Sequence, residues 1–305
     1  MKYACIDVGT NSIRLLIADV VGGRLENRQK KLEMARLGKG VNETKMLDPK
    51  RMIDSLNAID QFHREALEAG AEQVFIFATS AVRDAYNGID FRQMIYNKTG
   101  IELSIVSGNA EAEMGFHGVR QTMDSDGNAL VIDIGGGSME VAAGSRDGMK
   151  DAFSLNIGAV RLTGACITTD PVAPEEVEAL RREIVEHIAT IKPLFRPYHY
   201  EYAIGIGGTI TTFVAMANQM GGPYDGARIN EKRATLAQIR EINAELIRRS
   251  VEERKSMVGL DARRADIILA GGLILEHTME TFGIDWIRAS DYDNLEGYLV
   301  MQLEL

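Results

Sequence analysis

The feature that most constrains this chain is a pattern that occurs twice. Each copy has a short apolar strand that contains an aspartate, a turn of small polar residues, and a second apolar strand. The first copy, YACIDV-GTNS-IRLLIADV, begins at residue 3, and the second, LVIDI-GGGS-MEVAA, begins at residue 130. Turns of this composition between apolar runs favour β-hairpins. Two matched hairpins in tandem predict a duplicated α/β domain. The alternative is chance similarity between two common hairpins.

Helical patterns fill the chain between and after the hairpins. Asp48 and Pro49 are residue types preferred at the N-cap and first position of a helix, and Gly70 fits its end. A second long amphipathic helix is expected from Pro174 to about Leu194. Strands and helices alternate throughout, which predicts an α/β fold.

The length fits two domains of ordinary size, because the chain has 305 residues. The polar segment MDSDGN at 123–128 lies just before the second hairpin. We therefore predict one domain over 1–124 and another over 125–305, with the last helix free to pack back on the first domain.

The composition of the chain indicates which cell compartment and which classes of binding partner to expect. The chain shows no uncharged apolar run of about 18 residues, so we expect no membrane span. Its start lacks a signal-peptide pattern, and its two cysteines show no metal-ligand spacing, so we expect a reduced cytoplasm. The formal net charge of −10 argues against general nucleic-acid binding.

The two turns have the chemistry of phosphate-binding loops. Free backbone N–H groups, small residues and hydroxyls suit phosphate oxygens. Asp7 and Asp133 precede the turns by two residues, and a carboxylate beside phosphate needs a cation such as Mg²⁺ between them. Otherwise these are tight turns whose aspartates accept from turn amides. The candidate phosphate ligands are Gly9, Thr10, Asn11 and Ser12 in the first turn and Gly135, Gly136, Gly137 and Ser138 in the second.

A third turn, GGTITT from Gly207, follows a predicted strand and carries a weaker signal. Gly208 and Thr209 are phosphate-contact candidates there, and a plain helix N-terminus is the alternative.

Taken in order, six segments resemble the exopolyphosphatase / guanosine pentaphosphate phosphohydrolase (Ppx/GppA) family. They are DVGTNSIRLLIAD, ATSAVRDA, SGNAEAEMGFHGV, VIDIGGGSMEVA, IGIGGTITT and RADIILAGGLILE. The resemblance runs from residue 3 to about residue 300. It implies two tandem actin-like (ribonuclease H-like) domains with a cleft between them. It also implies the short form of the family, without a C-terminal helical extension.

The resemblance also implies roles for individual residues. Asp7 and Asp133 would hold Mg²⁺, Arg83 and the turns would bind phosphate, and Glu111 would orient or deprotonate the attacking water. Two departures stand out. Ala110 replaces the first of two adjacent glutamates common in the family, and Leu295 replaces an arginine in a Gly-Leu-Arg-Glu-Gly pattern.

The expected activity is Mg²⁺-dependent hydrolysis of a terminal phosphoanhydride in inorganic polyphosphate, guanosine pentaphosphate or both. Basic residues outnumber acidic ones between Arg24 and Arg51. We therefore expect Arg36 and Lys39 to line the approach to the cleft, the alternative being a solvated hairpin and helix start.

Other functions remain open from the sequence. An actin-fold kinase that uses ATP would need the same aspartates and turns. A non-catalytic sensor of guanosine polyphosphates or polyphosphate is kept open by the two departures. A filament subunit or chaperone ranks low, because 305 residues leave little room for insertions. A homodimer is the default expectation for the oligomeric state.

Overall fold

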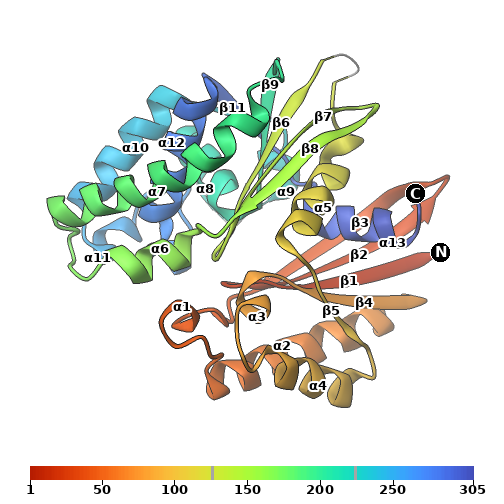
Figure 1. Ribbon diagram of the computed structural model, residues 1–305. Coiled ribbons are helices and arrows are strands. Elements are labelled where there is room, and N and C mark those ends of the chain that lie inside the picture. Colours follow the sequence, from red (N-terminus) through yellow and green to blue (C-terminus); the bar gives the residue numbers. More distant parts are fainter. Residues whose placement is uncertain (125–126, 223–224) are drawn as a thin grey trace.

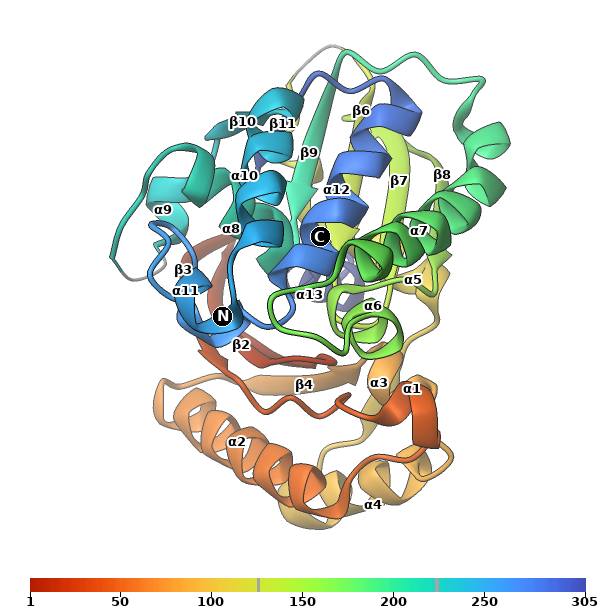
Figure 2. The same ribbon diagram turned by 90° about the vertical axis from the view of Figure 1, so that its left-hand side faces the viewer.

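The computed structural model describes residues 1–124, 127–222 and 225–305, and it contains two β-sheets, one from each half of the chain (Figures 1 and 2). The first sheet consists of β1 (Lys2–Val8), β2 (Ile13–Val21), β3 (Arg24–Glu33), β4 (Gln73–Ala78) and β5 (Leu103–Ile105). The second consists of β6 (Ala129–Ile134), β7 (Met139–Ser145), β8 (Gly148–Leu155), β9 (Tyr202–Ile206), β10 (Arg233–Thr235) and β11 (Trp286–Ala289).

The two sheets share one topology. The first has the strand order β3-β2-β1-β4-β5, and the second contains the equivalent order β8-β7-β6-β9-β11, with β10 added beside β11. In each, three antiparallel strands are followed by two strands parallel to the first strand of the hairpin. The predicted duplicated α/β architecture is therefore confirmed.

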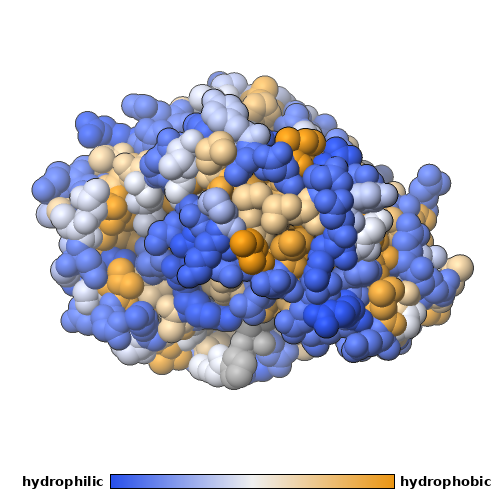
Figure 3. All heavy atoms as spheres, turned by 90° about the horizontal axis from the view of Figure 1, so that it is seen from below, coloured by the Kyte–Doolittle hydropathy of each residue, from blue (hydrophilic) through white to orange (hydrophobic). Residues whose placement is uncertain are grey.

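Four helices belong to the first sheet: α1 (Val41–Thr44), α2 (Pro49–Glu68), α3 (Ser80–Arg83) and α4 (Gly88–Thr99). The predicted start of α2 is confirmed, because the Asp48 carboxylate accepts from Arg51 N and Pro49 occupies the first turn. The surface over α2 and α4 is largely hydrophilic around a few apolar side chains (Figure 3).

The helices of the second half lie mainly over one face of its sheet (Figures 1 and 2). They are α6 (Ala159–Cys166), α7 (Pro174–Phe195), α8 (Gly207–Ala217), α9 (Gly226–Ile229), α10 (Leu236–Arg248), α11 (Val251–Arg254), the 3-10 helix η1 (Ala262–Arg264) and α12 (Ile268–Phe282). The largest apolar core of the chain lies between these helices and β6, β7 and β9.

Two helices, α5 (Gly108–Arg120) and α13 (Asn294–Gln302), lie between the sheets (Figure 1). Each packs on the sheet of the other half of the chain. Phe116 of α5 joins the apolar cluster of Val131 on β6, and Leu299 of α13 joins that of Cys5 on β1. The helices cross closely, since a Cβ at Gly297 would lie 1.7 Å from the carbonyl oxygen of Met114.

The predicted domain boundary between 124 and 125 falls partly on residue 125, which lies outside the described residues. The strands of the first sheet lie within 2–105 and those of the second within 129–289. Across the described ranges, no helix is long and apolar enough to cross a membrane.

Candidate active site

The two hairpin turns meet in the cleft between the halves of the chain. In each turn the first glycine donates its N–H to the carbonyl of the final serine, at 3.0 Å for both Gly9–Ser12 and Gly135–Ser138. A Cβ at Gly136 would lie 2.9 Å from Cβ of Thr10, so glycine is required for this close approach. The turns therefore line a common cavity of about 80 Å³.

This cavity brings together most of the residues singled out in the sequence. Asp7 enters it from β1, Asp133 from β6, and Glu111 from the first turn of α5, which begins where Ser107 Oγ accepts from Ala110 N. The predicted phosphate ligands that line it are Gly9, Thr10, Asn11, Ser12, Gly135, Gly136, Ser138, Gly208 and Thr209. Gly137 instead lines a neighbouring cavity, and Arg83 reaches the site through Glu111.

The two aspartates are buried and differently partnered. Asp7 Oδ2 accepts from Arg14 Nε at 2.9 Å, whereas its Oδ1 is buried without a hydrogen-bond partner in the described structure. Asp133 Oδ2 accepts from Asn294 Nδ2 at 2.9 Å. Burial raises the pKa of Asp133 to about 6, against the nearby Arg14 charge, and Asp293 and Asp7 raise it further.

These aspartates fit a divalent cation. The unpartnered Asp7 Oδ1 and the raised pKa of Asp133 both indicate negative charge that the protein itself does not fully neutralise. Gly207 (φ +78°) brings the backbone so close that a Cβ there would lie 2.2 Å from Asp133 Oδ1. Within the described ranges no group of three His, Cys, Asp or Glu side chains could enclose a metal. Mg²⁺ suits such a site, since it retains waters and uses substrate phosphates as ligands.

Glu111 is the third buried carboxylate. Burial raises its pKa to about 8, partly opposed by Arg83 and reinforced by Asp133 and Asp7. Arg83 Nη1 lies 3.2 Å from Glu111 Oε2 and also donates to the carbonyl of Val106 at 3.0 Å. Arg83 therefore fixes the orientation of the Glu111 carboxylate.

Sequence reasoning missed two charged residues beside the aspartates, although the hairpin register could have found them. Arg14 and Glu140 lie directly opposite Asp7 and Asp133 in the two hairpins. In the two equivalent hairpins, Asp7 therefore lies opposite the basic residue Arg14, whereas Asp133 lies opposite the acidic residue Glu140. Burial, with Glu111 and Asp133 nearby, raises the pKa of Glu140 well above its usual range, while Ser154 Oγ donates to it at 2.7 Å.

The DNLEG segment supplies two further polar contacts that the sequence did not reveal. Leu295 is buried in an apolar cluster, where the family pattern has an arginine. Its neighbours face the site instead: Asn294 donates to Asp133, and Asp293 Oδ2 accepts from Arg14 Nη1 at 2.7 Å. No sequence signal marked them, because both contacts join segments far apart in the chain.

A larger cavity of about 660 Å³ adjoins the candidate catalytic cavity between the two turns. The two share Arg14, Gly207, Gly208 and Arg264, and a Cβ at Gly208 would lie 2.4 Å from the Arg264 guanidinium. Its basic side chains are Arg14, Lys30, Lys31, Arg228, Arg263 and Arg264, and its acidic ones are Asp225, Asp261, Asp291 and Asp293. Basic groups therefore outnumber acidic groups along its walls.

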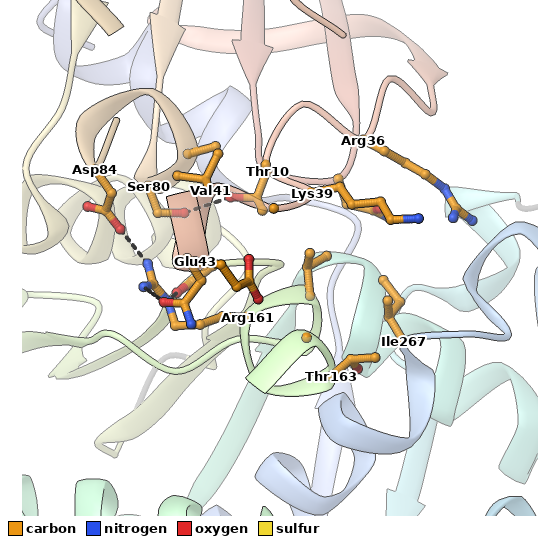
Figure 4. Close-up of a pocket in the computed structure, with 18 of the residues that line it drawn as sticks. Thr10, Arg36, Lys39, Val41, Glu43, Ser80, Asp84, Arg161, Thr163 and Ile267 are labelled. Atoms are coloured by element: carbon orange, nitrogen blue, oxygen red, sulfur yellow. Dashed lines mark hydrogen bonds and ion pairs between the residues drawn. The ribbon is translucent and has the colours of Figure 1, made fainter. Parts of the chain in front are cut away.

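A cavity of about 120 Å³, smaller than the one just described, is shown in Figure 4, and it shares Thr10, Asn11, Ser80 and Ile267 with the candidate catalytic cavity. The predicted approach residues, Arg36 and Lys39, line this smaller cavity. Arg36 is engaged there, because its Nη1 lies 2.8 Å from Asp266 Oδ2. Its role in the approach of substrate stays a prediction.

Comparison with known proteins decides the family. The pattern of the Ppx/GppA phosphatase family matches residues 16–305. The chain belongs to this family. It is 34% identical to exopolyphosphatase 2 of Mycobacterium tuberculosis, over 97% of each protein. The predicted family, and with it the fold of two actin-like domains, is thereby confirmed.

Solved structures agree with this assignment. The Aquifex aeolicus member of the Ppx/GppA family is 30% identical, with a TM-score of 0.83 over 100% of this chain and 98% of that one. An exopolyphosphatase from Cytophaga hutchinsonii is 25% identical, with a TM-score of 0.91 over 100% of this chain and 98% of that one. The chain is thus a member of a phosphatase family over its whole length.

Proposed function

We propose that this protein is a Mg²⁺-dependent exopolyphosphatase that removes the terminal phosphate of inorganic polyphosphate. The observation that carries the proposal is the convergence of Glu111, Asp7 and Asp133 with two phosphate-binding turns on one cavity. That cavity adjoins a larger one with an excess of basic groups, which would attract a polyanionic chain. The similarity to exopolyphosphatases supports the same substrate class.

The reaction assigned to the site is hydrolysis of a phosphoanhydride. The N–H groups and hydroxyls of the two turns hold the oxygens of the terminal phosphate. Glu111 accepts a proton from a water, whose oxygen bonds to the terminal phosphorus as the bridging P–O bond breaks. The shortened chain departs with the bridging oxygen. A Mg²⁺ ion held by Asp7 and Asp133 would neutralise the charge of the phosphate oxygens.

The high pKa of Glu111 fits this role once a cation is considered. A pKa of about 8 leaves the carboxyl largely protonated at neutral pH. Asp7 and Asp133 raise the pKa of Glu111, and a divalent cation held by these two residues would offset that effect, so the pKa would be lower than about 8. Metal binding would then favour the deprotonated form of Glu111.

We also propose guanosine pentaphosphate as a second substrate, because the larger cavity is big enough for a nucleoside. Ligand pockets typically enclose about 300–1,000 Å³, and this one holds about 660 Å³. Its lining also includes apolar side chains, among them Met220, Met257 and Leu260. Such walls can bind a purine while the phosphates extend to the catalytic turns.

A metal titration tests the exopolyphosphatase assignment. Phosphate release from polyphosphate is measured with the protein freed of divalent ions by a chelator and then supplied with increasing Mg²⁺. We expect release to depend on added Mg²⁺ and to be lost in Asp7→Asn. Full release in the presence of excess chelator would contradict the metal assignment, and no release under any condition would contradict the activity.

A further inference from the structure

The catalytic cavity has a second neighbour besides the large basic cavity. The catalytic cavity shares four lining residues with the larger cavity, namely Arg14, Gly207, Gly208 and Arg264. It shares four others with the smaller cavity, namely Thr10, Asn11, Ser80 and Ile267. Among the described residues none lines both neighbouring cavities, so they adjoin the catalytic cavity on different walls. A terminal phosphate in the catalytic cavity would therefore lie between two other cavities.

The geometry of phosphoryl transfer determines on which side of the phosphorus each product lies. The attacking water and the departing oxygen lie roughly in line on opposite sides of the phosphorus. If the rest of the chain occupies the larger cavity, the water and the freed phosphate lie on the side away from it. The shortened chain then blocks the larger cavity, and the orthophosphate needs another outlet if the chain stays bound.

We propose that the smaller cavity is this outlet and binds orthophosphate on its way to solvent. This inference rests on the proposed exopolyphosphatase function. Roughly 10–15 Å³ of cavity suffices for one water, and about 120 Å³ is available here. An orthophosphate with part of its hydration shell fits this space, whereas a nucleoside does not.

Two hydroxyl side chains lie where the catalytic cavity meets the smaller cavity. Thr10 Oγ1 and Ser80 Oγ lie 2.8 Å apart in a buried hydrogen bond (Figure 4). Gly137 faces this pair from the second turn, and a Cβ there would lie 2.4 Å from Ser80 Oγ. Hydroxyls can rotate and both donate and accept. They can therefore exchange their mutual bond for bonds to a passing phosphate oxygen.

The charges of the smaller cavity suit the release of orthophosphate better than the binding of a polyphosphate chain. Its lining carries three basic and three acidic side chains: Arg36, Lys39, Arg161, Glu43, Asp84 and Asp266. Arg36 pairs with Asp266, and Arg161 pairs with Asp84 (Figure 4 shows the latter contact). A wall with balanced charge does not concentrate a polyanion, but it keeps a small anion hydrated as it leaves. The excess of basic groups in the larger cavity favours the chain there.

The smaller cavity can be narrowed without touching the groups assigned to catalysis. Gly164 lies on α6 in the lining, and a Cβ there would lie 2.9 Å from Glu43 Oε1 on α1. A large side chain at this position would therefore fill the gap between α1 and α6. Ala165 is exposed and outside the lining, so Ala165→Trp is the matched control.

The experiment measures cleaved phosphate in two ways during the first turnovers with polyphosphate and Mg²⁺. Acid quenching counts all cleaved phosphate, and a fluorescent phosphate-binding reporter counts only phosphate that has left the protein. In wild type and Ala165→Trp we expect the two signals to coincide. In Gly164→Trp free phosphate should lag behind cleaved phosphate, with steady-state turnover lower by roughly tenfold or more. Gly164→Leu should give a smaller lag, and it replaces the tryptophan variant if that one does not fold.

The outcomes separate this inference from the proposed function. Coincident signals and unchanged turnover in folded Gly164→Trp and Gly164→Leu would overturn the outlet. A raised KM for polyphosphate in these variants, without any lag, would also overturn the outlet. That result would instead assign this cavity, with Arg36 and Lys39, to the approach of the chain. If wild type released no phosphate by either method, the exopolyphosphatase assignment itself would fail.

Discussion

Asn294 Nδ2 donates a hydrogen bond of 2.9 Å to Asp133 Oδ2. Asn294 is the first residue of α13, the helix of the second half that packs on the first sheet. The same segment contacts Arg14, the partner of Asp7, through Asp293. Both candidate metal-binding aspartates are therefore oriented by the start of α13.

This contact predicts that Asn294 sets the affinity for the metal. Asn294→Ala removes the donor that orients Asp133, and loss of such an outer contact typically weakens metal binding by about 10–100-fold. We expect the Mg²⁺ concentration for half-maximal activity to rise by this factor. Asn97→Ala, on the exposed surface of α4, is the control. An unchanged Mg²⁺ dependence in Asn294→Ala would show that Asp133 does not need this donor.

Glu111 is predicted to be the general base. Glu111→Gln keeps the size of the side chain and removes the proton acceptor, so we expect kcat to fall by about 10²–10⁴-fold. Polyphosphate binding, measured by calorimetry, should remain. Glu113→Gln, two residues along α5 and outside the cavity lining, should retain activity. Near-normal turnover in Glu111→Gln would remove this role.

The pH dependence should follow the ionisation of Glu111. The base acts when deprotonated, so kcat/KM at saturating Mg²⁺ should rise with pH. Its midpoint should lie above the ordinary glutamate pKa of 4.5 and below the value of about 8 that holds without a cation. Arg83 lowers the pKa of Glu111, and therefore Arg83→Gln should move the midpoint to higher pH. A shift to lower pH would show that Arg83 does not act through Glu111.

Glu140 should affect stability in a pH-dependent way. Its folded-state pKa is raised well above 4.5, mainly by burial. The stabilisation is therefore fully present below the unfolded-state pKa and is lost as the pH rises through the folded-state pKa. Glu140→Gln cannot ionise, so its melting temperature relative to wild type should increase from pH 5 to pH 9. Glu252→Gln, at an exposed position, should show no such trend. A constant difference across this range would mean that Glu140 ionises as easily in the folded as in the unfolded protein.

The sequence predicted the parts of this structure that depend on neighbouring residues. The two hairpins and the Asp48 cap follow from local turn and cap chemistry, whereas the cleft between the two domains was implied by the family resemblance. The packing of α5 on the second sheet could not be predicted, because it depends on which apolar faces meet after folding. The same holds for Asn294 and for the pairing of Arg36 with Asp266, which join residues far apart in the chain.

We propose that this cavity hydrolyses a terminal phosphoanhydride with water as the acceptor. The most direct test measures phosphate release from polyphosphate, guanosine pentaphosphate and ATP in parallel, with Mg²⁺, for wild type and Glu111→Gln. We expect wild type to release phosphate from polyphosphate, with guanosine pentaphosphate as a second substrate, and Glu111→Gln to release little from either. Transfer of phosphate only from ATP to an added acceptor, with polyphosphate left intact, would contradict the account.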